Sequence, residues 1–324
     1  IMENTYNFVS VKNKNVRYLG RWTVDSLARS YFQSGVEFYF TGKLAGVDVL
    51  CEGRDCALTV SVDNEKSFVV PYRTDGVLLL ADNLGKGIHH IAIHADFQEK
   101  LPVFKAFVLN EGGETVQGKK RPSIEFIGDS ITVGYVRDGI GSTSLTFCDN
   151  VARQLDCAYS ILAYGGITMT ERPTAADCTG MINRYFKLGP ICAGEAQNIP
   201  WDIHNYIPDN VVISLGTNDW DDSWDKTGYY DRFEGDYISF IKRLKQVYTD
   251  TRFFVSTPYD VIYKKTAEKI RNIVKSFDEV ILLEAYRGIK PQMFNAIDHV
   301  HINETAHSIV ADNFASEIKK YGKF

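Results

Sequence analysis

Four polar clusters in the second half of the chain have residue types that suggest acyl-transfer chemistry. Three directly follow an apolar run, and the fourth is reached from the last run through "RGIKPQMFNAI". In chain order the clusters are Gly128-Asp129-Ser130, Gly165-Gly166, Gly216-Thr217-Asn218-Asp219 and Asp298-His299-Val300-His301. If the runs are parallel strands, the clusters meet at one edge, because ligands of such sheets bind beyond the carboxyl ends of the strands. One edge would then carry a hydroxyl, an imidazole, a carboxylate and an amide.

A serine hydroxyl becomes a useful nucleophile when a neighbouring imidazole takes its proton. The imidazole in turn needs a carboxylate that holds its tautomer and orientation. Asp298 precedes His301 by three residues, so it could bind one ring nitrogen while the other faces Ser130. We therefore interpret Ser130 as nucleophile, His301 as general base and Asp298 as the orienting acid.

Negative charge that develops on a substrate oxygen needs hydrogen-bond donors that are already in place. The N–H of Ser130, a glycine N–H from Gly165 or Gly166, and the side-chain amide of Asn218 could supply three such donors. The residues alone leave open which of the two glycines donates.

Several of these residues also have plainer explanations. Ser130 could only cap a helix, since serine is a preferred N-cap residue, but the other three clusters favour the nucleophile. We interpret Asp129 as a local hydrogen-bond organiser and Asp219 as a support for the loop of Asn218. His299 and His307 are interpreted as structural or surface residues.

Aromatic residues near the third cluster could form an apolar platform for a sugar ring. Trp220 and Trp224 follow Asn218 closely and are the substrate-binding candidates, with ordinary loop packing as the alternative. Trp201 and Tyr185 are weaker candidates for the same role.

Metal and cofactor sites are not predicted. His90 and His94 of "HHIAIH" would share a strand face, but four strand residues span roughly 13 Å, too far for one ion with bonds near 2 Å. The acidic loop "NDWDDSWD" lacks the glycine and terminal glutamate of an EF-hand. No CxxC pair, Walker-type loop or dinucleotide fingerprint occurs among the six cysteines and 25 glycines.

The two halves of the chain differ in hydrophobic period. Residues 16–110 alternate at period two, as in "GVEFYFTG", "ALTVSVDN" and "VFKAFVLN", where Phe104, Ala106 and Val108 are placed on one face. Beyond a Gly- and Lys-rich segment at 110–122, continuous apolar runs alternate with helical patterns, which indicates a parallel sheet covered on both faces. We expect a jelly-roll-like β-sandwich over 1–118 and an α/β domain with about five parallel strands over 119–324.

Composition limits the classes of partner. The chain has 324 residues, 44% apolar residues and a net charge of −5, with no basic stripe, which argues against nucleic acid. No apolar stretch approaches the roughly 20 residues of a membrane span. If Met2 is the native start, the segment after it is no signal peptide and the protein is expected in the cytoplasm; a leader removed ahead of it would mean secretion. The oligomeric state is left open.

The four clusters together resemble the four sequence blocks of the SGNH (GDSL-like) hydrolases, in the same order, over residues 122–324. The resemblance implies Ser130, His301 and Asp298 as the catalytic triad, with oxyanion donors at Asn218 and a second-block glycine. That block departs from the family pattern, since two adjacent glycines stand in "AYGGITMT". We favour Gly166 and keep Gly165 open.

The layout resembles carbohydrate esterase family 2 more closely, in "GKGIHHIAIH", the following "EKLPVF" and "IEFIGDSITVGY". That family joins an N-terminal β-sandwich to an SGNH domain, and some members orient the histidine with a main-chain carbonyl instead of a carboxylate. The resemblance implies a cofactor-free serine esterase that removes acetyl groups from plant xylan or mannan oligosaccharides. The alternatives are another SGNH activity (thioesterase or lysophospholipase) and a non-catalytic carbohydrate-binding protein.

Overall fold

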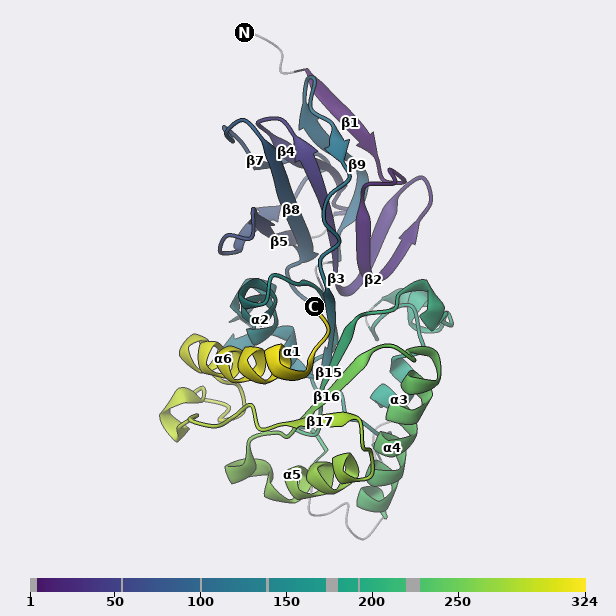
Figure 1. Ribbon diagram of the computed structural model, residues 1–324, viewed down its shortest axis with the longest axis vertical. Coiled ribbons are helices and arrows are strands. Elements are labelled where there is room, and N and C mark those ends of the chain that lie inside the picture. The colour runs from purple at the N-terminus through teal and green to yellow at the C-terminus, as the bar shows by residue number, and fades with distance from the viewer. Residues whose placement is uncertain are drawn as a thin grey trace.

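Five parallel strands form the centre of the second half of the chain. The computed structural model describes residues 5–53, 55–99, 101–137, 140–172, 180–191, 193–219 and 228–324. The five strands are paired in the order β17-β16-β15-β11-β14, and part of this sheet is visible in Figure 1. Their bounds are β11 (Ser123–Gly128), β14 (Ala158–Ala163), β15 (Asn210–Ser214), β16 (Arg252–Ser256) and β17 (Val280–Leu283).

Helices cover both faces of this sheet. Those with defined bounds are α1 (Ser130–Val133), α2 (Phe147–Gln154), α3 (Met181–Arg184), α4 (Tyr229–Val247), α5 (Asp260–Lys275) and α6 (Glu304–Tyr321). Short 3₁₀ helices are η1 (Thr143–Leu145), η2 (Gly194–Gln197), η3 (Ile203–Asn205) and η5 (Pro291–Met293). None of the described helices combines the length and the apolar character needed to cross a membrane.

The continuous apolar runs arise because successive strand residues enter two different cores. In β11, Phe126 packs with α1, α2 and α6, whereas its neighbour Ile127 packs with α3, α4 and much of α5. Side chains alternate between the faces of a strand, so a strand buried on both faces is apolar at nearly every position. The polar residues that follow each run therefore stand at the strand ends.

The first half of the chain is built from antiparallel strands around a separate core that includes Val36, Phe38, Phe40, Leu58 and Val60. Their bounds are β1 (Tyr6–Ser10), β2 (Arg17–Val24), β3 (Ala28–Thr41), β4 (Ala45–Leu50), β5 (Cys56–Val62), β6 (Phe68–Tyr72), β7 (Gly76–Ala81), β8 (Ile88–Ala95), β9 (Val103–Asn110) and β10 (Thr115–Val116). A short hairpin, β12 (Tyr135–Arg137) with β13 (Ile140–Gly141), lies in the second half. The jelly-roll topology of the first half and the boundary at 118/119 stay predictions.

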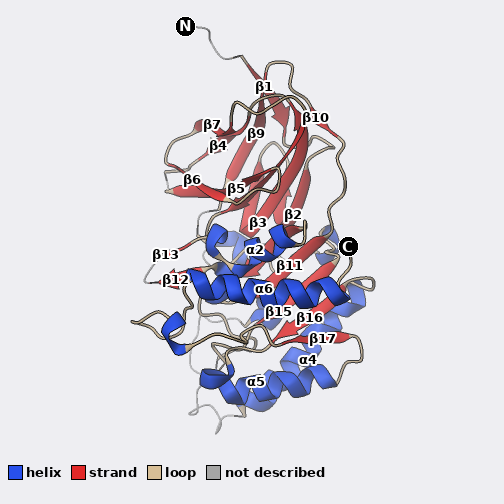
Figure 2. Ribbon diagram, turned by 60° about the vertical axis from the view of Figure 1, so that its left-hand side comes forward, coloured by secondary structure: helices blue, strands red, loops and turns tan. Residues whose placement is uncertain are grey.

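The number of parallel strands agrees with the expected five or so, but the sheet that contains them is larger than expected. Strand β3 is 14 residues long, and its Gln33 pairs with Ile161 of β14. Through β3 the parallel strands join the antiparallel ones in a single 15-stranded sheet. Figure 2 shows the helix-covered strands below the strands of the first half, with β3 between them.

The prediction of which β9 side chains face the core is correct at Phe104 and wrong after it. Phe104 faces the core as expected, but Phe107 and Leu109 follow it there instead of Ala106 and Val108. The register against β4 shifts between Asp48 and Val49, which pair with Ala106 and Phe104. Such a bulge places one extra residue in β9 and moves the following side chains to the other face.

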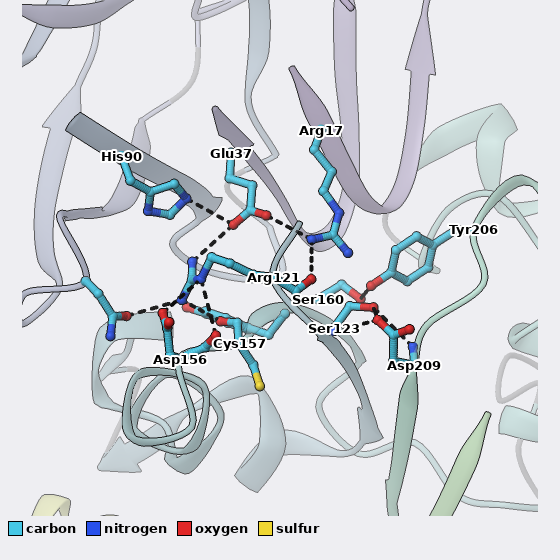
Figure 3. Close-up of polar contacts among 12 residues, drawn as sticks. Arg17, Glu37, His90, Arg121, Ser123, Asp156, Cys157, Ser160, Tyr206 and Asp209 are labelled. Carbon is cyan, nitrogen blue, oxygen red and sulfur yellow. Dashed lines mark hydrogen bonds and ion pairs between the residues drawn. The ribbon is translucent and has the colours of Figure 1, made fainter. Parts of the chain in front are cut away.

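A buried polar cluster holds the two halves together beside β3, as Figure 3 shows. The carboxylate of Glu37 accepts hydrogen bonds from Arg17 (3.0 Å) and Arg121 (3.1 Å), and it lies 3.2 Å from the ring of His90. Burial acts to raise the pKa of Glu37, but the hydrogen bond with His90 and the Arg121 charge lower it to about 2. Arg121 also donates to the carbonyl of Cys157 (2.9 Å), just ahead of β14.

Candidate active site

Ser130 stands at the turn between β11 and α1, and it does not cap that helix. The cap is Asp129, whose Oδ1 accepts the N–H of Ile131 at 3.1 Å. Burial raises the pKa of Asp129 to about 6. A side chain at position 128 would collide with Thr132, which explains the glycine of the Gly-Asp-Ser sequence. Because Asp129 supplies the cap, the Ser130 hydroxyl can point elsewhere.

The hydroxyl of Ser130 lies against the imidazole of His301, 171 positions away in the chain, with an Oγ–Nε2 distance of 2.9 Å. The other ring nitrogen, Nδ1, lies 2.8 Å from Oδ2 of Asp298. If Nδ1 carries the ring proton and donates it to Asp298, Nε2 can accept the serine proton. This is the arrangement of nucleophile, base and orienting acid found in serine hydrolases.

The loop itself holds Asp298 in an ionised form. Its Oδ1 accepts the N–H groups of Val300 (2.8 Å) and His301 (2.9 Å). Partial burial acts to raise the pKa of Asp298, but hydrogen bonds from the His301 ring and from these two N–H groups lower it below its usual value. A carboxylate is therefore available to orient the imidazole over the neutral pH range.

A tight turn after β14 presents the second-block glycines. The N–H of Ile167 donates to the carbonyl of Tyr164 at 3.2 Å, and Gly166 has a φ of +77°, the left-handed value that favours glycine at the third position of a type II turn. The Gly165 N–H donates to Oε1 of Gln98 at 2.7 Å. Within the described part of the chain the Gly166 N–H donates no hydrogen bond, so Gly166 is the glycine available to a substrate oxygen.

Asn218 and Asp219 fasten the same loop from the end of β15. The Asn218 amide donates to the carbonyl of Ile167 at 3.0 Å, which leaves its second N–H to point elsewhere. Both oxygens of Asp219 lie 3.0 Å from the N–H of Met169, and Oδ1 accepts the hydroxyl of Tyr229 at 2.7 Å. The interpretation of Asp219 as a support for the loop of Asn218 is corrected by these contacts, since its carboxylate instead holds the loop that follows Gly166.

Burial raises the pKa of Asp219 to about 7, whereas an aspartate of the unfolded chain titrates near about 4. Between these values the folded protein holds a proton that the unfolded chain releases, so the free energy of unfolding falls as pH rises. Asp219→Asn is expected to reduce this fall between about pH 4.5 and pH 7, measured by urea unfolding. Asp231→Asn, exposed on α4, is the matched control. An unchanged pH dependence in Asp219→Asn would contradict the expectation.

The four clusters line one hollow of about 430 Å³, with Gln98, Tyr135 and Tyr164 also in its wall. Of the sugar-platform candidates, Trp220 and Trp224 lie outside the described residues. Neither of the two weaker candidates is among the described residues that line the hollow. Tyr185 is fully buried, with its hydroxyl 2.5 Å from Glu125, and Trp201 packs over the buried guanidinium of Arg21.

Sequence reasoning missed Gln98 and Tyr135. The Tyr135 ring lies 5.3 Å from the His301 ring, centroid to centroid. Gln98 belongs to the segment after β8, in the half of the chain where no chemistry was expected. Tyr135 is the last residue of "IEFIGDSITVGY", but its place in that stretch did not mark it as a site residue, and Gln98 lies in no quoted motif. The tertiary structure brings both side chains to the hollow.

The histidines of "HHIAIH" take separate structural contacts. His90 lies against Glu37, while His94 stacks on Tyr159 with its Nε2 3.0 Å from the Tyr159 carbonyl. Burial lowers the pKa of His94 to about 4. No group of three or more metal-ligating side chains is found among the described residues.

Comparisons with known proteins were made once this geometry was known. No protein-family model matches the chain. The cellulase/esterase CelE of Acetivibrio thermocellus is 25% identical over 310 residues, which cover 88% of this chain and 36% of that protein. The chain thus spans about a third of the length of this curated relative.

Solved structures share the fold over nearly the whole chain. A family two carbohydrate esterase from Clostridium thermocellum, in complex with cellohexaose, has a TM-score of 0.76 at 23% identity and covers 94% of this chain and 98% of its own. An acetyl xylan esterase from Butyrivibrio proteoclasticus has a TM-score of 0.75 at 17% identity and covers 98% of both chains. These comparisons agree with the resemblance that the motifs predicted: the chain is similar in sequence to a cellulase/esterase and shares the fold of solved family 2 carbohydrate esterases.

Proposed function

We propose that the protein is a serine esterase that removes acetyl groups from acetylated plant oligo- or polysaccharides of the xylan or mannan type. The observation that carries this proposal is the alignment of Ser130, His301 and Asp298 through contacts of 2.9 and 2.8 Å. The relationship to carbohydrate esterases, one described as an acetyl xylan esterase and another in complex with cellohexaose, supports a sugar ester as substrate.

The mechanism follows from these contacts. Ser130 Oγ attacks the acetyl carbonyl while its proton passes to His301 Nε2. The oxyanion accepts hydrogen bonds from the N–H groups of Ser130 and Gly166 and from the Asn218 amide. The Ser130 N–H is suited to this role, since the first N–H groups of a helix have no partner within the helix. Collapse of the intermediate expels the sugar hydroxyl, which takes its proton from His301, and leaves an acetyl-enzyme.

Hydrolysis of the acetyl-enzyme reverses these roles. Water gives a proton to His301 Nε2 and its oxygen attacks the acetyl carbonyl. The second intermediate then collapses to acetate, and His301 returns the proton to the departing Ser130 Oγ. Asp298 stabilises the imidazolium in both half-reactions without taking its proton. The residues required are all supplied by the chain.

Asp298→Ala is expected to lower kcat on an acetyl ester by about 100-fold or more, because the imidazole would lose both its tautomer and its orientation. The measurement is steady-state hydrolysis of 4-nitrophenyl acetate, with far-ultraviolet circular dichroism to verify the fold. Asp312→Ala, on an exposed site of α6, is the control. A negligible effect of Asp298→Ala would mean that another group, such as a main-chain carbonyl, orients His301.

The lining of the hollow favours a small acyl group. Val300 is the one aliphatic side chain among the described residues that line it, and the others are polar, aromatic or glycine. A thioesterase or lysophospholipase needs an apolar channel for a long acyl chain, since each buried CH₂ contributes about 0.8 kcal/mol. The acetyl group needs no such channel.

A substrate panel tests the proposal. Release of acetate would be measured on acetylated xylo-, manno- and cello-oligosaccharides, beside 4-nitrophenyl octanoate and an acyl-coenzyme A thioester. We expect kcat/KM for the best acetylated oligosaccharide to exceed that for the octanoyl ester by about tenfold or more. Preference for the octanoyl ester or the thioester would favour the other SGNH activities. Binding of the oligosaccharides without release of acetate would favour a non-catalytic carbohydrate-binding protein.

A further inference from the structure

Gln98 reaches the catalytic hollow from the first half of the chain. It follows β8, is 3% exposed, and its Oε1 accepts the Gly165 N–H at 2.7 Å, 67 positions away. Gln98 is thus a buried side chain from the antiparallel half in direct contact with the turn that carries Gly166.

The segment just ahead of Gln98 is held by several contacts. The carbonyl of Asp96 accepts the N–H of Thr143 at 2.7 Å, and its Oδ1 accepts the hydroxyls of Ser142 (2.5 Å) and Thr59 (2.8 Å). The ring of the following residue, Phe97, packs edge-on against the ring of Tyr135, with the ring centroids 4.8 Å apart. A side chain on so constrained a backbone can hold a partner in one orientation, because little freedom remains to be lost.

The contact between Gln98 and Gly165 affects the orientation of the proposed oxyanion donor, the Gly166 N–H, because both glycines belong to the same turn. The turn's own hydrogen bond uses the Ile167 N–H and leaves the N–H groups of Gly165 and Gly166 unused. Gln98 takes the first of these, while Arg172 donates to the carbonyl of Gly166. The Tyr164–Gly165 peptide and the Gly166–Ile167 peptide are therefore each held by a side chain. The Gly165–Gly166 peptide between them carries the Gly166 N–H, and these two contacts restrict its orientation.

Two glycines in sequence make this support necessary. Glycine has the largest range of backbone conformations, so a Gly-Gly turn would sample several orientations of its N–H groups without external contacts. An oxyanion donor acts by being oriented before the reaction, and a displacement of about 1 Å can cost about 100-fold in rate. The first half of the chain provides one of the contacts that prevents this displacement.

We propose that Gln98 is a positioning residue of the oxyanion hole, so that the antiparallel half of the chain completes the active site. Gln98 accepts the Gly165 N–H and thereby leaves the Gly166 N–H directed at the substrate oxygen. This inference rests on the esterase function proposed above.

The test compares Gln98→Met, which keeps the side-chain length but loses the acceptor, with Gln117→Met, an exposed control in the segment near β10. Both would be assayed with 4-nitrophenyl acetate and with methylboronic acid, which forms a tetrahedral adduct with a catalytic serine. For Gln98→Met we expect kcat to fall about tenfold to 100-fold, with KM within about threefold of wild type. The inhibition constant of methylboronic acid is expected to rise by a similar factor.

A purely structural role would change the unfolding temperature or the fraction of active enzyme, but it would not make kcat and boronate affinity change together. Unaltered kcat in a folded Gln98→Met variant would overturn the proposal. If that variant does not fold, Gln98→Ala is measured in the same way, and failure of both to fold would identify Gln98 as a core residue only. Ser130→Ala assayed in parallel separates the two claims, because activity retained in that variant would refute the esterase mechanism itself.

Discussion

Ser130→Ala is expected to lower kcat on acetyl esters by about 10⁴-fold or more, because the acyl group would have no hydroxyl to which it can be transferred. The loss should not come from unfolding. Ser130 is small and its side chain is used neither for the helix cap nor in the hydrophobic core, since Asp129 caps α1. The unfolding temperature is therefore expected to stay close to that of wild type.

The measurement is the release of 4-nitrophenol and of acetate by purified wild-type and variant protein. Ser308→Ala, exposed on α6, removes a hydroxyl far from β11 in sequence and is expected to keep wild-type activity. Equal rates for Ser130→Ala and wild type would remove the serine mechanism and leave sugar binding as the alternative.

His301→Gln is expected to lower kcat by a comparable factor, about 10⁴-fold, because a single group both takes the proton of Ser130 and returns one to the leaving group. The loss should be larger for an acetylated oligosaccharide than for 4-nitrophenyl acetate. A sugar hydroxyl is a poor leaving group unless it is protonated as the bond breaks, whereas 4-nitrophenolate leaves without that help.

The comparison of two leaving groups tests whether His301 acts as the general acid, in addition to whether it is required for the reaction. Both esters would be assayed with wild type, His301→Gln and His204→Gln, an exposed histidine outside the hollow. Equal penalties on both esters would argue against His301 as the general acid, and wild-type activity in His301→Gln would argue against any role in the reaction.

The arrangement of Ser130, His301 and Asp298 could be predicted because each lies in a short motif, with Ser130 just after β11 and the other two in the segment between β17 and α6. Parallel strands bring their carboxyl ends to one edge whatever the chain distance between them. Asp-x-x-His spacing also favours a local contact, which the 2.8 Å distance bears out in geometry. The catalytic roles themselves stay predictions until the variants are measured.

Contacts between segments that are distant in the chain could not be predicted from the sequence. The choice between Gly165 and Gly166 depends on Gln98, which stands in the other half of the chain and carries no motif. The extent of the sheet depends on one strand, β3, that is long enough to pair in both halves. A bulge in β9 shifted the faces that period-two alternation had assigned, since alternation holds only while the register is unbroken.

The most direct test of the central claim is to label the nucleophile. Diethyl 4-nitrophenyl phosphate transfers its phosphoryl group to an activated serine and leaves a stable adduct that peptide mass mapping can locate. The account predicts one diethylphosphoryl group per chain on Ser130, with esterase activity lost in proportion to labelling and no labelling in His301→Gln. Activity that persists with Ser130 fully labelled, or that disappears while the label is on another residue, would contradict it.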